Sequence, residues 1–228
     1  MKVYDRPGFP NPSRIRIALA EKGMESQIDF VSVDLIAAEH KQQPYLEKNP
    51  LGTIPALELD DGTHISECVA ITEYLDNLDG NPVLTGKTPK EKALIHMMQR
   101  RVDVELIDAV GHYFHHATPG LGDALFKHKS PEWEHRKSWG AREGVRALKA
   151  MKYLDGVLQT QSYVAGDTFS MADISVFAGL NFADAAGLVI GEELQALKEW
   201  RVRVSERPSV KNRSGQMFVA EDLKRLGF

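Results

Sequence analysis

The sequence predicts an α+β chain, in which a small domain of strands and helices in the order βαβ-ββα precedes an all-helical domain. Strand-like and helix-like segments alternate over residues 1–79. Residues 80–89 are rich in helix and strand breakers, and strand patterns nearly vanish after them. We therefore expect a first domain over 1–79, a linker over 80–89 and a helical domain over 90–228.

The βαβ part of the first domain is predicted from its hydrophobic periodicity. Residues 1–4 and 28–34 have the pattern of strands, and residues 14–23 between them have that of an amphipathic helix. Gly23 should close this helix, because glycine readily adopts the left-handed conformation of a C-cap. Ser13 stands directly before the helix and is expected to be its N-cap.

The ββα part lies in residues 49–71, the most informative stretch of the chain. In order, its parts are a loop ending in Ile54-Pro55, a strand over 56–59, a turn over 60–62, a second strand over 63–65 and a helix opened by Ser66-Glu67. Proline cannot donate to a strand ladder, so the backbone of Ile54 should stay unpaired. With a cis bond before Pro55, Ile54 could offer its N–H and C=O to an extended peptide. The helix start at Glu67 adds N–H groups for a carboxylate, so the stretch predicts a pocket for a small acidic peptide.

The second domain is predicted to consist of helices with recognisable start signals. Thr88, Pro89 and Glu91 supply an N-cap, a first-position proline and an acid three residues after the cap. Ser170 and Asp173 form a similar capping box. Four helices are expected: one from Pro89 to about His116, one from Glu132 to about Leu158, one from Ser170 onward and one from Leu194 to Glu206.

Composition narrows the class of protein. The chain has 228 residues and 43% hydrophobic residues, enough for a substantial core. Its single cysteine, Cys68, rules out an intrachain disulfide framework and favours a cytoplasmic location. The net charge of −4 gives no general attraction to nucleic acid, and no apolar run reaches the roughly 20 residues of a membrane span. We expect neither nucleic acid nor a membrane as partner.

The ordered set of segments resembles the glutathione transferase superfamily over nearly the whole chain. The resemblance rests on four motifs: the proline loop at Pro55, the hairpin that follows it, the helix start at Glu67 and the capping motif over 163–174. The resemblance implies a thioredoxin-like first domain, glutathione as co-substrate without another cofactor or metal, and a homodimer. Met97-Met98 could belong to its interface or to the core.

The resemblance also implies which residues bind glutathione. Glu67 should meet the ammonium of the γ-glutamyl end while the backbone amide of Cys68 meets its carboxylate. His40 and Lys41 should lie over the glycyl carboxylate, where a charged partner is needed. The whole expected binding set is Asn11, His40, Lys41, Thr53, Ile54, Pro55, Glu67 and Cys68. Glu67 could instead only complement the helix dipole, and His40 and Lys41 could be ordinary loop residues.

The group that activates the glutathione sulfur is harder to assign. The superfamily usually places Tyr, Ser or Cys just after the first strand, but here Phe9, Pro10 and Asn11 occupy those places. Ser13 is the one hydroxyl in this loop and is a candidate catalyst beside its expected capping role. The chain thus resembles the divergent yeast and bacterial branch that lacks the usual activator, in which water is thought to take its place.

The segment 112–120 draws attention for the same reason. His112, His115 and His116 have the spacing of one helix face, and they could cap the helix end, hold a metal or orient a water. We take His115 and His116 as catalytic candidates and expect no metal. Phe9, Tyr113 and Thr118 are the candidates for contact with the acceptor substrate.

The function predicted from the resemblance is conjugation of the glutathione thiolate to small electrophilic apolar substrates. A non-catalytic module that binds glutathione or hydrophobic ligands remains an alternative, because the activating hydroxyl is missing. A glutathione-dependent thiol reductase or peroxidase is a third possibility, although Cys68 is misplaced for it.

Overall fold

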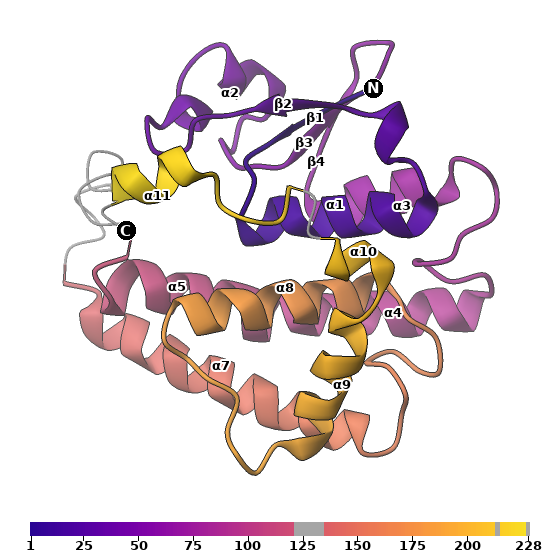
Figure 1. The fold of residues 1–228 in the computed structure, drawn as a ribbon, viewed down its shortest axis with the longest axis vertical. Helices are drawn as coiled ribbons and strands as arrows, with labels where there is room; N and C mark the ends of the chain where they lie inside the picture. The colour runs from indigo at the N-terminus through magenta and orange to yellow at the C-terminus, as the bar shows by residue number, and fades with distance from the viewer. Residues whose placement is uncertain (121–134, 213–214, 227–228) are drawn as a thin grey trace.

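The computed structural model describes residues 1–120, 135–212 and 215–226. A four-stranded sheet lies at one side of the molecule and a layer of helices at the other, with α1 and α3 between them (Figure 1). The strand order is β2-β1-β3-β4; β1 pairs parallel with β2 and antiparallel with β3, and β4 pairs antiparallel with β3. This arrangement confirms the predicted α+β class and its thioredoxin-like first domain.

Most elements of the first domain lie where the sequence predicts them. Their bounds are β1 Lys2–Asp5, α1 Pro10–Lys22, η1 Glu25–Gln27, β2 Asp29–Ser32, η2 Glu39–Lys41, α2 Tyr45–Lys48, β3 Ala56–Glu58, β4 His64–Ser66 and α3 Cys68–Asn77. Gly23 closes α1 with a φ of 64°, as expected of a glycine C-cap. Helix α1 begins earlier than predicted, because the rings of Pro10 and Pro12 fit the first turn of a helix. Phe9 is therefore its N-cap, and the prediction that Ser13 caps α1 is wrong.

The remaining helices are α4 Pro89–Val102, η3 Asp103–Ile107, α5 Asp108–Ala117, α7 Lys137–Leu158, α8 Met171–Ala185, α9 Gln195–Ser205, α10 Pro208–Lys211 and α11 Ala220–Leu226. The long helix predicted to end near His116 is present, but η3 inside it is a π-helical turn, which the sequence did not predict. The start predicted for the next helix, at Glu132, lies outside the described residues. None of the described helices is both long and apolar enough to cross a membrane.

The sheet buries both of its faces because side chains alternate along each strand. Val3 and Leu57 point into a core shared with α1 and α3. Tyr4 and Ala56, their neighbours in the chain, point into the opposite core, where Tyr45 of α2 packs. The sheet is thus a two-sided platform whose central strands fix the position of the loops at its edge.

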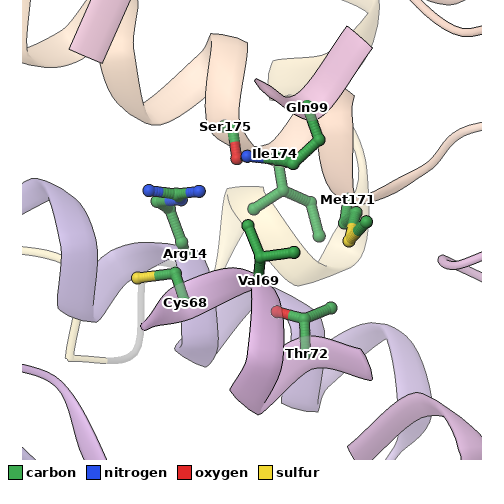
Figure 2. Close-up of a pocket in the computed structure, with 8 residues that line it drawn as sticks. All are labelled: Arg14, Cys68, Val69, Thr72, Gln99, Met171, Ile174 and Ser175. Carbon is green, nitrogen blue, oxygen red and sulfur yellow. The ribbon is translucent and has the colours of Figure 1, made fainter. Parts of the chain in front are cut away.

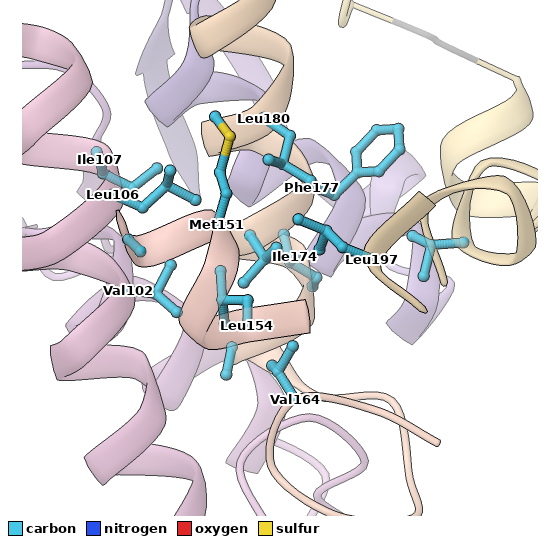
Figure 3. Close-up of a cluster of buried hydrophobic side chains, with 14 of the residues drawn as sticks. Val102, Leu106, Ile107, Met151, Leu154, Val164, Ile174, Phe177, Leu180 and Leu197 are labelled. Atoms are coloured by element: carbon cyan, nitrogen blue, oxygen red, sulfur yellow. The ribbon is translucent and has the colours of Figure 1, made fainter. Parts of the chain in front are cut away.

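Helix α1 is buried on two sides. Ile15 and Leu19 belong to the core between α1, α3 and the sheet, whereas Ile17 and Ala18 belong to the large core of the helical layer. That larger core, shown in part in Figure 3, gathers apolar side chains from α4, η3, α7, α8 and α9, including Val102, Met151 and Ile174. Helix α1 therefore holds the two layers together.

Asp173 organises the start of α8. It lies three residues after the N-cap Ser170, and the two residues form the predicted capping box. The Asp173 carboxylate accepts hydrogen bonds from the Val164 and Ser170 N–H groups, both at 3.0 Å, and from the Trp200 indole at 3.1 Å. Its side chain is fully buried, and this burial raises the pKa of Asp173 to about 6 despite the hydrogen bonds.

This raised pKa gives a testable pH dependence. The folded protein holds the Asp173 proton more tightly than the unfolded chain, so the contribution of Asp173 to stability falls as pH rises from about 4 to about 6. Two pKa units correspond to about 3 kcal/mol. We expect the stability advantage of the wild type over Asp173→Asn, measured by urea unfolding, to shrink by about that amount between pH 4 and pH 7. An advantage that grows with pH would mean that the hydrogen bonds outweigh burial.

Candidate functional site

The loop before β3 leaves a stretch of backbone open. The Ile54–Pro55 bond is cis, as predicted from the sequence. No described residue forms a hydrogen bond with the N–H or C=O of Ile54, although the Ile54 side chain is buried among Tyr4, Tyr45 and Ala56. The preceding carbonyl, of Thr53, is held by the Tyr45 hydroxyl at 2.6 Å and by the Asn49 amide at 2.8 Å. Ile54 therefore presents a donor and an acceptor from a fixed backbone.

The basic residues predicted for the site lie against this loop. Lys41, at the end of η2, donates from Nζ to the Leu51 carbonyl at 3.1 Å. A Cβ on Gly52 would lie 2.6 Å from the His40 carbonyl oxygen, so only glycine permits this close approach. Burial lowers the pKa of Lys41, because it removes water from the ammonium, and an anion bound beside it would act in the opposite direction. The structure thus places His40 and Lys41 against Leu51 and Gly52 of this loop, and their role at the glycyl carboxylate stays a prediction.

The N-terminus of α3 is a set of unsatisfied donors. The N-cap Glu67 has a φ of 69°, a conformation that costs a non-glycine residue free energy and that clusters at binding sites. Its exposed side chain makes no capping hydrogen bond. The N–H groups of Cys68, Val69 and Ala70 have no acceptor among the described residues, whereas the Ile71 N–H bonds the Glu67 carbonyl at 3.0 Å. A carboxylate would satisfy these three donors and the positive end of the helix dipole.

The N-terminus of α1 offers a single donor. Pro10 and Pro12 have no N–H, and the Ser13 N–H bonds the Phe9 carbonyl at 3.1 Å. The N–H of Asn11 remains, and it has no acceptor within the described part of the chain. The side chain of Asn11, which was expected in the glutathione-binding set, accepts from Arg14 at 3.1 Å. Pro10 and Pro12 are the signal in the sequence that could have identified the backbone N–H of Asn11.

The Ser13 hydroxyl is engaged within the helix. Its Oγ donates to the carbonyl oxygen of Phe9 at 2.9 Å, one turn earlier. A proton held there is not directed at a ligand in front of the helix. Ser13 is therefore poorly placed to activate a sulfur, although the sequence made it a candidate.

Cys68 joins the starts of α1 and α3. Its thiol donates to the Asn11 carbonyl oxygen at 3.5 Å, and its side chain is buried. This burial raises the pKa of Cys68 to about 11, because water is excluded from the thiol, although the charge of Arg14 acts in the opposite direction. Cys68 thus acts as a protonated, packed residue.

Arg14 lies behind the site, at the junction of the two layers. It lines a cavity of about 10 Å³, roughly the size of one water, together with Cys68 of α3 and Gln99 and Ser175 of the helical layer (Figure 2). Arg14 donates to the carboxylate of Asp103 at 2.8 Å as well as to Asn11. The sequence does not predict that this arginine is buried, because a charged residue in an amphipathic helix ordinarily faces solvent.

The histidines divide between two environments. The rings of His112 and His116 lie 4.7 and 5.1 Å from the ring of Trp139, on the face of α5 that packs against α7. His112 also contacts Glu143 of α7, with Nδ1 to Oε2 at 3.2 Å. The His115 ring lies beside Phe114 at 5.3 Å. His116 is therefore a packing residue between helices, which leaves His115 as the better candidate of the two.

Tyr113 and Thr118 have structural contacts of their own. The Tyr113 ring fills the space above Gly144 of α7, where a Cβ would clash with it. The Thr118 hydroxyl donates to the Phe114 carbonyl at 2.7 Å and accepts from the Gly120 N–H at 3.0 Å, which closes the end of α5.

Over residues 1–120, 135–212 and 215–226, no group of three or more His, Cys, Asp or Glu residues could hold a metal ion.

The open backbone groups at Ile54, at the start of α3 and at Asn11 suit a small acidic peptide, and they lie on a thioredoxin-like platform with a helical partner domain. Residues 10–78 match the family model of the glutathione S-transferase N-terminal domain, and residues 118–208 match that of the C-terminal domain. The chain therefore belongs to the glutathione S-transferase family, and it is an enzyme of that family.

Among its relatives is Glutathione S-transferase 2 of Saccharomyces cerevisiae, 55% identical over 211 residues, which are 92% of this chain and 88% of the relative. The crystal structure of Gtt2 from the same organism superposes with a TM-score of 0.88 and 54% identity, over 94% of this chain and all of that one. A glutathione S-transferase domain-containing protein of Marinobacter aquaeolei VT8 superposes with a TM-score of 0.85 and 49% identity, over 92% of this chain and all of that one. These matches confirm the predicted resemblance to the yeast and bacterial branch.

The burial of Cys68 predicts an unreactive thiol. With a pKa of about 11 instead of 9.0, Cys68 should be about 100-fold less ionised than an exposed thiol at pH 8. We expect iodoacetamide to label the native protein at least that much more slowly than the urea-unfolded protein, followed by mass spectrometry. Rapid native labelling would show that the thiol is exposed or ionised.

Proposed function

We propose that this enzyme conjugates the thiolate of glutathione to small electrophilic apolar substrates. The observation that carries the proposal is the set of backbone groups left open around one edge of the sheet: Ile54, the start of α3 and Asn11. Each group would meet a different part of glutathione: the start of α3 the γ-glutamyl α-carboxylate, Ile54 the cysteinyl backbone and the Asn11 N–H the cysteinyl sulfur. Glu67 would accept from the ligand ammonium, and His40 and Lys41 would face the glycyl carboxylate, with Thr53 and Pro55 shaping the loop between them.

Activation of the sulfur by the Asn11 N–H would explain how the enzyme works without the Tyr, Ser or Cys that the superfamily usually has after the first strand. A thiolate in front of α1 would accept this one N–H and meet the positive end of the helix dipole. Both effects favour the ionised sulfur and lower the thiol pKa. A water oriented by His115 is a second route, and His116, packed on Trp139, has less support. The electrophile would enter over Phe9, which is half-buried at the start of α1.

A direct assay separates this function from the alternatives. The purified protein should bind immobilised glutathione and conjugate chlorodinitrobenzene, which gives an absorbance change. Binding without conjugation would favour a non-catalytic glutathione-binding module. Reduction of a small disulfide at the expense of glutathione would favour a thiol reductase, which the buried and protonated Cys68 argues against.

The remaining expectations belong to the same proposal. A homodimer is supported by exposed apolar side chains on α4 and α7, such as Met97 and Leu148, while Met98 is buried in the core. A cytoplasmic location is supported by the single reduced cysteine. We keep the domain division at the linker 80–89, and we propose that no cofactor is needed besides glutathione itself.

Glu67 should matter for binding far more than for folding. We expect Glu67→Ala to weaken glutathione affinity by about 1.5–3 kcal/mol, because the ligand ammonium loses its charged partner. Calorimetry measures the affinity, and a melting curve checks the fold. Glu73→Ala, on the same helix and paired with His96, is the matched control and should leave affinity unchanged. Unaltered affinity in a folded Glu67→Ala would remove Glu67 from the site.

The activation proposal is tested by a pair of substitutions at Asn11. Asn11→Pro removes the backbone N–H, whereas Asn11→Ala removes only the side chain. We expect Asn11→Pro to raise the apparent thiol pKa of bound glutathione by about 1–2 units, the loss of one hydrogen bond to a charged group. Thiolate absorbance against pH measures it, with His115→Ala in the same series. If His115→Ala gives the larger rise and Asn11→Pro none, the histidine-and-water route is correct.

A further inference from the structure

The end of the chain returns to the start of α1. After α10, residues 215–219 run past the N-terminal end of α1, and α11 follows near the edge strand of the sheet (Figure 1). This C-terminal segment, Gly215–Leu226, is the last described part of the chain and lies more than 200 residues from the loop that it covers. None of the binding contacts described above involves it.

A buried ion pair fixes the C-terminal segment to the first loop. Asp222 is fully buried, and its carboxylate receives both Nε, at 2.6 Å, and a terminal nitrogen of Arg6. Such a two-point pair sets the orientation of the helix as well as its position. Arg6 also donates to Ser32 Oγ at 2.8 Å, and Arg225 donates to Asp34 at 2.8 Å. Helix α11 is thus bonded to the β1–α1 loop through Arg6 and to the segment after β2 through Asp34.

Two glycines show that the approach is close. Gly8 has a φ of 87°, and a Cβ there would lie 2.5 Å from Phe218 Cα. Gly215 has a φ of 63°, and a Cβ there would clash with the guanidinium of Arg16. Both positions require glycine for their backbone conformation as well as for space. The close contact therefore depends on one glycine in the loop before α1 and on one glycine in the C-terminal segment.

The contact places a second aromatic ring beside Phe9. The rings of Phe9 and Phe218 meet edge to face with centroids 5.0 Å apart, and both side chains are half-buried. Phe9 is the N-cap of α1, two residues before the open N–H of Asn11. An acceptor that reacts with a sulfur held at Asn11 would lie close to these rings, and an edge-to-face pair readily adds a further aromatic group.

We propose that Phe218 is a specificity-determining residue that forms, with Phe9, an aromatic wall for the acceptor substrate. Arg6 and Asp222 are positioning residues that hold this wall in place. The inference rests on the proposed function, because it uses the sulfur position at Asn11. It assigns the C-terminal segment to the site and predicts a preference for acceptors that carry an aromatic ring.

The test compares ligand affinities and does not depend on turnover. Calorimetry would measure glutathione, S-benzylglutathione and S-hexylglutathione on the full chain. We expect Phe218→Ala to weaken S-benzylglutathione about 3- to 10-fold, the range of a lost aromatic contact, with S-hexylglutathione affected less. Affinity for glutathione itself should stay within twofold. Asp222→Asn should shift the same ratio in the same direction, and the neighbouring Val219→Ala is the control that should not.

The outcomes separate this inference from the function. Equal affinity of the wild type and a folded Phe218→Ala for S-benzylglutathione would overturn the wall, whatever the conjugation assay gives. A parallel loss for all three ligands would also overturn it, because it would mean that the segment only supports the tripeptide site. Conversely, a wild-type protein that binds S-benzylglutathione through Phe218 but conjugates no substrate would support the aromatic wall and contradict the proposed conjugation activity.

Discussion

The burial of α1 on two sides is the constraint on which the rest of the structure depends. Ile15 and Leu19 fix one face to the sheet, and Ile17 and Ala18 fix the next face to the helical layer. A helix held in this way cannot rotate or slide without exposing apolar surface at about 25 cal/mol per Å². The position of its first turn, and hence of the Asn11 N–H, is therefore set by packing far from the site.

The polar side of the same junction runs through Arg14. Its guanidinium joins Asn11 at the first turn of α1 to Asp103 at the start of the π-helical turn. Asp103 accepts in turn from Gln99 at 2.9 Å, and Gln99 accepts from Ser175 of α8 at 3.0 Å. Buried charges are tolerated only when they are paired and hydrogen-bonded, so each member of this chain restricts the geometry of the next. The helical domain thereby takes part in placing the Asn11 side chain, although none of its described residues belongs to the proposed tripeptide site.

The parts that the sequence predicted well are those governed by local rules. The hairpin after Pro55, the C-cap at Gly23 and the capping boxes at Thr88 and Ser170 each depend on a few neighbouring residues, and each is present. Helix α1 begins four residues before the predicted start, because Pro10 and Pro12 form its first turn and Ser13 is not its N-cap. The reactivity of Cys68 depends on its burial, which the sequence does not show. Tertiary contacts decide these cases, and the same holds for the Arg6–Asp222 pair, whose partners lie 216 positions apart.

The two helix starts at the site differ in how many N–H donors they offer, and this difference fits the tasks proposed for them. The first turn of α3 leaves the N–H groups of Cys68, Val69 and Ala70 open, which suits a carboxylate with two oxygens and several lone pairs. The first turn of α1 leaves one, because Pro10 and Pro12 remove the others. A single donor suits a sulfur, a large and weakly accepting atom that gains little from several short hydrogen bonds. The prolines also spare the helix two N–H groups that would need water when the site is empty. With the role proposed for the Asn11 N–H, a thiolate would be stabilised through the backbone alone, which would account for the missing hydroxyl after the first strand.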